Sequence, residues 1–191
     1  MSASRIHTLA GMRDVVGRDY GTLRAAAGGF ATVADGSGYR AIDTPLLESA
    51  ELFARKAGGE MASQAYTFID PGGRRISVRP EFTSSVIRHF VGLDPRPALP
   101  VRLQYGGPVF RYEQGGNGPF RQFTQVGAEL IGAGGVDGDS EVLTLALEGL
   151  QATGVAGLQM RVGHIGLLQD LLNGYGLSDT ANLFAVGSVQ A

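Results

Sequence analysis

The sequence predicts an α+β fold in which helices flank an antiparallel sheet, and three observations carry this prediction. The stretch Arg102–Gly132 reads as two strands joined by a glycine-rich turn. The segments 66–69 and 75–79 read as two further strands around a strong turn signal, Asp70-Pro71-Gly72-Gly73. The remaining regular segments carry helical signals, at residues 18–34, 80–90, 140–152 and in the C-terminal stretch 160–179.

The first helix is expected from Arg18 to Ala34, although Gly28 and Gly29 weaken it. Its apolar residues recur near helical spacing, at Leu23, Ala27, Phe30 and Val33. The glycines of residues 35–38 end the helix. A short strand over residues 40–43 follows and stops at Thr44-Pro45, since proline terminates strands.

Three later helices are expected. One opens after Pro80 and runs to about Phe90, with Thr83 or Ser84 as its cap. Another covers Ser140–Ala152, with a core-facing stripe of Leu143, Ala146, Leu147 and Leu150. Met160–Asp179 reads as a strand followed by an amphipathic helix, with a buried stripe of Ile165, Leu168, Leu171 and Leu172.

Polar side chains gather on one face of the hairpin within Arg102–Gly132. Strand side chains alternate with period two, so one face carries Val109, Arg111 and Glu113, and on the second strand Arg121, Phe123, Gln125, Gly127 and Glu129. Charged groups placed on a sheet interior need a ligand or each other. The mixture suits a ligand with an anionic part, a cationic amine and a flat ring. An ion pair of Arg111 with Glu113, and ordinary packing of Phe123, are the simpler interpretations.

A family resemblance rests on these residues. FRYE, a loop and then RQFTQVGAELIG resemble motif 2 of the class II aminoacyl-tRNA synthetases, in the form of the histidyl-tRNA synthetases and their relatives. Four upstream segments resemble the same family in the same order, namely GMRD (11–14), GYRAIDTPLLESAELFARKAGGE (38–60), YTFID (66–70) and VRPEFTSSVIR (78–88). The resemblance implies a class II synthetase-like antiparallel sheet flanked by helices. Residues 1–191 would be the N-terminal part of that catalytic core, without motif 3 or an anticodon-binding domain.

The resemblance also implies roles for individual residues. Histidine binding would involve Glu81, Thr83, Gln125 and Glu129. Nucleotide binding, as family ancestry, would involve Arg111, Glu113, Arg121 and Phe123. The segment around Pro45 is similar to motif 1, which implies a dimer interface and a homodimer.

Two functions follow from the family, and the motif 2 loop separates them. Synthetases usually carry a sequence such as ERPQxGRxRxF; this chain has EQGGNGPFRQF, with Gln114 and Pro119 at two arginine positions. Losing cations from a site that stabilises pyrophosphate argues against adenylation. The stretch 160–179 resembles the VGHxGLxxxLLxxxGL pattern of the regulatory paralogues. The resemblance therefore favours a regulatory subunit of ATP phosphoribosyltransferase in histidine biosynthesis, which binds the short catalytic subunit, senses histidine and has no catalytic residue or cofactor.

Two alternatives remain. The first is an enzyme, a histidine–tRNA ligase that forms histidyl-adenylate from ATP and histidine with Mg and charges tRNA. The second is a stand-alone paralogue that binds an amino acid or nucleotide for another partner. A downstream RGLDYY-like motif with an anticodon domain would favour the ligase, and an adjacent gene for a short phosphoribosyltransferase would favour the regulator.

Composition narrows the function classes. Sixteen basic against eighteen acidic residues do not give the basic surface that RNA binding needs. The absence of cysteine excludes disulfides, thiolate catalysis and cysteine zinc sites. His7, His89 and His164 lack metal-ligand spacing, so no metal site is predicted. Neither a signal-peptide pattern nor an apolar run of membrane-spanning length is present, and a cytoplasmic protein is expected.

Overall fold

The computed structural model describes residues 6–55, 63–112, 120–176, 178, 180, 181 and 185. It forms two compact units, Met1–Ala156 and Gly157–Ala191. The first unit contains α1 (Gly17–Gly36), β1 (Arg40–Ala41), β2 (Leu47–Ser49), α2 (Ala50–Ala54), β3 (Thr67–Ile69), β4 (Arg75–Val78), α4 (Thr83–Val91), β5 (Val101–Phe110), β6 (Gln122–Ile131) and α5 (Gly135–Ala152). The second contains α6 (Ile165–Gly174).

The strands of the described residues form two three-stranded sheets. One has the order β1-β5-β6, with β1 parallel to β5 and β5 antiparallel to β6. The other has the order β2-β4-β3 and is antiparallel throughout. The predicted α+β fold is confirmed. One correction applies: because β1 is parallel to β5, the β1-β5-β6 sheet is mixed and not purely antiparallel.

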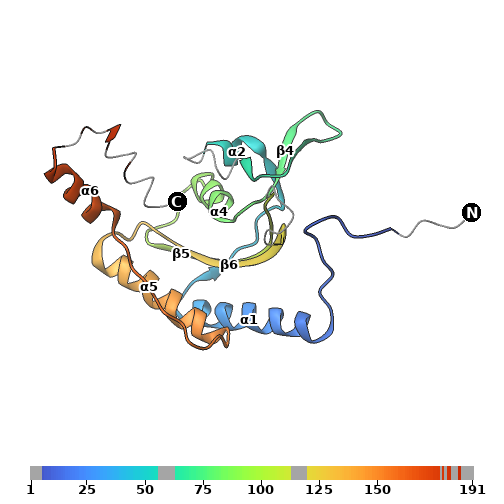
Figure 1. Ribbon diagram of the computed structural model, residues 1–191, viewed down its shortest axis with the longest axis horizontal. Coiled ribbons are helices and arrows are strands. Elements are labelled where there is room, and N and C mark those ends of the chain that lie inside the picture. Colours follow the sequence, from blue (N-terminus) through green and yellow to red (C-terminus); the bar gives the residue numbers. More distant parts are fainter. Residues whose placement is uncertain are drawn as a thin grey trace, which may run out of the picture. The chain divides into compact units, whose positions relative to one another are not determined.

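Helices α1 and α5 cover one face of the β5–β6 hairpin, below the strands in the view of Figure 1. The buried residues there are Phe30, Ala34, Tyr39 and Leu145, with Val126, Ala128 and Leu130 of β6 packed against them. The prediction of a helix at residues 18–34 is confirmed. Gly29, which seemed only to weaken it, has a packing role because an added Cβ would overlap the backbone carbonyl of Ala152 at the end of α5.

The predicted apolar stripe of α5 is wrong. The helix starts at Gly135, and its buried residues are Gly138, Leu145 and Gly149. Of the predicted stripe, Ala146 is half-buried, whereas Leu143, Leu147 and Leu150 are exposed. The reason is close helix packing, since a Cβ at Gly149 would lie 2.6 Å from the Phe30 ring. Gly149 therefore receives the Phe30 ring with Leu145 buried in the same cluster, and Leu143, Leu147 and Leu150 are left exposed.

The opposite face of the hairpin carries a second buried cluster, formed with α4. Its members are Phe82 and Val86 of the α4 region and Tyr105 and Val109 of β5, with Ile42, Leu103 and Phe123 against them. Figure 1 shows α4 on the side of the strands away from α1. The two faces of one hairpin thus pack against different helices.

In the second unit the predicted helix is confirmed as α6, but it has no buried residue among those described. Residues 160–163 do not form the expected strand. His164 has a local role, because its Nδ1 accepts a hydrogen bond from the Leu167 N–H at 3.1 Å and so caps the helix. Within the described part of the chain, no helix is long and apolar enough to span a membrane.

Candidate functional site

The start of α4 and the face of β5–β6 that it covers bring the predicted polar residues together. In the strand register, Leu103 pairs with Glu129, Tyr105 with Gly127 and Gly107 with Gln125. These residues share one face because side chains alternate along a strand. The expected placement of Phe123, Gln125, Gly127 and Glu129 on one face is confirmed.

Glu81 caps α4 from the turn that precedes it. It is only 3 % exposed, and its two carboxylate oxygens accept from the Ser84 N–H at 3.1 and 3.2 Å. The N-cap position is Phe82, without a side-chain cap, so the expectation that Thr83 or Ser84 caps the helix is wrong. A carboxylate suits this place because the helix N-terminus carries partial positive charge and unpaired N–H groups.

Tyr105 contacts one of the two predicted carboxylates, Glu129, although the sequence did not single it out. Its hydroxyl donates to Glu129 Oε1 at 3.1 Å, and its ring stacks on Phe82 with centroids 4.5 Å apart. Burial raises the pKa of the Tyr105 phenol far above its ordinary value; a hydrogen bond from Thr83 opposes this, and the charges of Glu129 and Glu81 add to it. The Tyr105 phenol therefore stays protonated near neutral pH and can donate a hydrogen bond.

Gln125 adds an acceptor without a partner. Its Oε1 is buried and has no hydrogen-bond partner among the described residues. Buried acceptors are nearly always paired in folded proteins, so such an atom calls for an explanation. Together with Glu81 and Glu129 it gives this end of the face a surplus of acceptors, which suits a ligand that donates N–H groups.

Two arginines occupy the end of the hairpin nearer its turn. Arg111 donates through Nε to the Pro80 carbonyl at 3.0 Å, and its guanidinium lies 5.1 Å from the Phe123 ring centre. Arg121 donates through Nη1 to the Ala10 carbonyl at 3.3 Å. Glu113, Gln114 and Pro119 lie outside the described residues, and with them the expected Arg111–Glu113 pair.

Arg79 is a buried cation that the sequence did not reveal. It is 3 % exposed, and it donates through Nε to the Pro108 carbonyl at 2.9 Å and through Nη1 to the Thr44 carbonyl at 2.7 Å. Its guanidinium also lies 3.8 Å from the Phe82 ring centre. Arg79 therefore ties the segment before Pro45 to the hairpin and to the ring beneath Tyr105. Pro45 itself is exposed; whether it forms a dimer interface stays a prediction.

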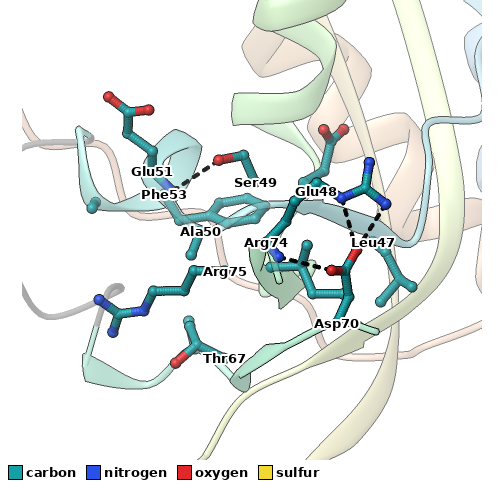
Figure 2. Close-up of a pocket in the computed structure, with 13 residues that line it drawn as sticks. Leu47, Glu48, Ser49, Ala50, Glu51, Phe53, Thr67, Asp70, Arg74 and Arg75 are labelled. Carbon is teal, nitrogen blue, oxygen red and sulfur yellow. Dashed lines mark hydrogen bonds and ion pairs between the residues drawn. The ribbon is translucent and has the colours of Figure 1, made fainter. Parts of the chain in front are cut away.

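A hollow of about 840 Å³ lies elsewhere, between α2 and the β2-β4-β3 sheet (Figure 2). None of the predicted site residues lines it. Its acidic side chains already have arginine partners: Glu48 pairs with Arg88, Glu51 with Arg55, and Asp70 with Arg74, the last pair drawn in Figure 2. This hollow is therefore a weaker candidate than the acceptor-rich face of the hairpin. In the described residues, no group of three or more acidic or histidine side chains is placed to hold a metal.

Known proteins resemble the chain over most of its length. The family model described as histidyl-tRNA synthetase matches residues 11–186. Histidine–tRNA ligase of Methanococcus vannielii is 40 % identical over 145 residues, which are 76 % of this chain and 34 % of that protein.

Solved structures give the same family. An ATP phosphoribosyltransferase regulatory subunit/histidyl-tRNA synthetase from Bacillus halodurans is 28 % identical with a TM-score of 0.75, over 88 % of this chain and 44 % of that one. Apo histidyl-tRNA synthetase of S. aureus is 34 % identical with a TM-score of 0.66, over 80 % of this chain and 41 % of that one. The chain thus spans less than half the length of each of these relatives. By fold and sequence it belongs to the histidyl-tRNA synthetase family.

Proposed function

We propose that this chain serves as a non-catalytic regulatory subunit of ATP phosphoribosyltransferase, which binds histidine and the short catalytic subunit. The observation that carries the proposal is a contrast along one face of the hairpin. At one end of this face, Glu81, Gln125 and Glu129 keep a set of hydrogen-bond acceptors. At the other end, the loop 113–119 contains no cation. A histidine sensor needs the acceptors and can dispense with the cations.

The acceptor set supports histidine as the ligand. Histidine offers an α-ammonium and a ring N–H, both donors. Glu81 and Glu129 supply carboxylates for these groups, and Gln125 supplies a buried oxygen that no described group pairs. Thr83, at the first position of α4, lies close enough to hydrogen-bond the Tyr105 hydroxyl at the centre of this set. Carboxylates placed this way favour a cationic amine over a neutral or anionic ligand.

The charge balance at the other end argues against adenylation. The loop 113–119 reads EQGGNGP and contains no arginine or lysine. Arg111 and Arg121 already donate to protein carbonyls, and Arg121 also lies 4.5 Å from the Tyr112 ring centre. Stabilising a pyrophosphate leaving group depends on cations aimed at the developing charge. A chain without loop cations is a poor catalyst for that step.

One relative supports this choice and another supports the alternative. The Bacillus halodurans structure is described as a regulatory subunit of ATP phosphoribosyltransferase/histidyl-tRNA synthetase. The Methanococcus vannielii protein, with the higher identity, is a histidine–tRNA ligase. The alternative function is therefore a histidine–tRNA ligase, which would use ATP, Mg and tRNA.

Two assays on the intact protein distinguish these functions. For the regulator, histidine-dependent exchange of pyrophosphate into ATP is absent, and adding the protein to a short-form ATP phosphoribosyltransferase catalytic subunit raises phosphoribosyl transfer to ATP. Glu81→Ala should abolish the histidine response of the mixture, whereas Glu148→Ala, on the exposed side of α5, should leave it unchanged. Clear exchange activity together with no effect on the catalytic subunit would establish the ligase instead.

A further inference from the structure

Another hollow lies between β1, the last turn of α4 and the segment that leads into β5. Its volume is about 550 Å³, which is within the range of small-ligand sites. Glu81 and Thr83, which are predicted to bind histidine, lie at the other end of α4 and do not line it. No residue predicted for nucleotide binding lines it either. The hollow is therefore a feature that the proposed function does not use.

The strand register places a cation beside an apolar wall of this hollow. Arg40 of β1 pairs with Leu103 of β5, and Ile42 follows two residues later, so the three side chains share one face. Ile42 and Leu103 belong to the edge of the cluster that surrounds Phe82. Arg40 is exposed. Its guanidinium is therefore at the open side of a hollow whose inner wall is hydrophobic.

Two side chains of this hollow have hydrogen-bond donors to offer. Arg40 carries five N–H groups, and the ring of His89 carries at least one in either protonation state. Neither side chain has a partner among the described residues. The third basic residue of the lining, Arg102, is different, because it is paired with Glu141. Arg40 and His89 are thus the groups that a ligand can use.

The acceptors near this hollow are already used or point elsewhere. The last carbonyls of α4 accept hydrogen bonds from the Gly92 and Leu93 N–H groups. None of the described residues that line the hollow is acidic, and Asp43 and Asp94, which flank it in the sequence, are not part of the lining. The hollow therefore has a surplus of donors, which is the reverse of the face around Gln125. Such a surplus suits a ligand that bears an oxyanion.

We propose that this hollow binds a small ligand in which an oxyanion, phosphate or carboxylate, is attached to a flat apolar body. Arg40 and His89 hold the oxyanion through charge-assisted and neutral hydrogen bonds. The half-buried side chains of Phe90 and Leu93 contact the flat body. The prolines Pro97 and Pro100 form part of the wall, where their fixed φ limits rearrangement. The inference stands independently of the proposed histidine site.

Calorimetric titration of the protein with phenyl phosphate, benzoate and inorganic phosphate tests the inference. Phenyl phosphate should bind about ten-fold more tightly than inorganic phosphate, because only the ester buries a ring against the apolar wall. The comparison of phenyl phosphate with benzoate identifies the oxyanion, since both carry the same ring. Tighter binding of the first assigns the hollow to phosphate esters, and tighter binding of the second assigns it to carboxylates.

Three variants identify the residues that hold the anion. Arg40→Gln should weaken binding of phenyl phosphate about ten-fold, because a charge-assisted hydrogen bond is lost. His89→Ala should weaken it about three-fold, as expected for one neutral hydrogen bond. Arg18→Gln, at an exposed position of α1, removes the same charge outside the hollow and is the matched control. Its effect should be less than about two-fold, since exposed charges at a distance are screened.

Two results would overturn the inference. Equal affinities for phenyl phosphate and inorganic phosphate would mean that the apolar wall takes no part, and equal losses in Arg40→Gln and Arg18→Gln would mean that anions respond only to net charge. Absence of binding for all three probes at millimolar concentration would overturn it as well. Circular dichroism establishes that each variant is folded. If Arg40→Gln does not fold, His89→Ala and the comparison of the probes decide.

Discussion

Two glutamines on opposite faces of the β5–β6 hairpin show how differently the molecule treats buried polar groups. Gln104 faces α1, is buried, and its Nε2 has three acceptors within reach: Asp35 Oδ1 at 2.6 Å and the carbonyls of Tyr39 and Ala31 at 3.2 and 3.3 Å. Gln125 faces the α4 side, and its buried Oε1 has no partner among the described residues. The first glutamine completes the fold, whereas the second leaves a hydrogen bond to be made.

The surroundings of the two faces differ in the same way. On the α1 side, Val126, Ala128 and Leu130 pack against an apolar cluster. On the α4 side, carboxylates and a phenol are held in place by Phe82 and by two positions without a Cβ, Gly107 and Gly127. Both faces of the hairpin therefore bury an apolar cluster, and the α4 side adds polar groups that can bind a ligand.

The largest expected effect is on the face of the hairpin that α1 and α5 cover. Phe30→Ala should lower the free energy of unfolding by about 3–5 kcal/mol, because it opens a cavity between α1, α5 and β6. Urea unfolding followed by circular dichroism measures this, with the half-exposed Phe68→Ala as the matched control. A loss below about 1 kcal/mol for Phe30→Ala would show that this face does not carry the stability.

The two glutamines provide the sharpest matched pair. Gln104→Leu should cost about 1–3 kcal/mol, because it leaves the Tyr39 carbonyl and the Asp35 carboxylate without their donor. Gln125→Leu should be close to neutral for stability, since it removes an acceptor that no described group satisfies, but it should weaken histidine binding. Equal losses of stability for Gln104→Leu and Gln125→Leu in the same urea experiment would contradict the proposed difference between the two faces.

The smallest expected effect is a pH dependence at Glu141 of α5. Hydrogen bonds from Arg102, at 2.6 and 2.7 Å, and then from Tyr39 hold the pKa of Glu141 below its ordinary value of 4.5. A carboxylate with a lowered folded-state pKa contributes stability above about pH 4.5 and loses it as the pH falls further. The urea midpoint of the wild type should therefore fall toward that of Glu141→Gln as the pH is lowered from 6 to 3. Parallel curves for the two proteins would contradict this.

The two-residue alternation of side chains along a strand was sufficient to predict the hairpin and the shared face of Phe123, Gln125 and Glu129. Residues separated by an even number of positions on a strand necessarily point to the same side. The contacts that depend on a distant element were not predictable. The face of α5 is set by Gly149, which accepts the Phe30 ring, and the leucine pattern alone pointed elsewhere.

Tyr105 and Arg79 were missed for a similar reason. Each acts through groups far away in the sequence, Glu129 for Tyr105 and the Thr44 carbonyl for Arg79. The one available signal was that Tyr105 falls on the same face as Glu129 once the strands are paired. Glu81 was singled out for binding, yet its helix-capping bond to the Ser84 N–H became visible only in the structure.

The central claim is that the α4 side of the hairpin binds histidine in preference to other ligands. Calorimetric titration with histidine tests it most directly, with histidinol and arginine as competing ligands and Glu148→Ala as the control variant. The account predicts binding that prefers histidine and weakens about ten-fold to a hundred-fold in Glu81→Ala, because a charge-assisted contact worth about 1.5–3 kcal/mol is lost. It predicts a comparable loss in Glu129→Ala, which leaves the α4 cap intact. Histidine binding unchanged in both variants, or no preference for histidine over arginine, would contradict the account.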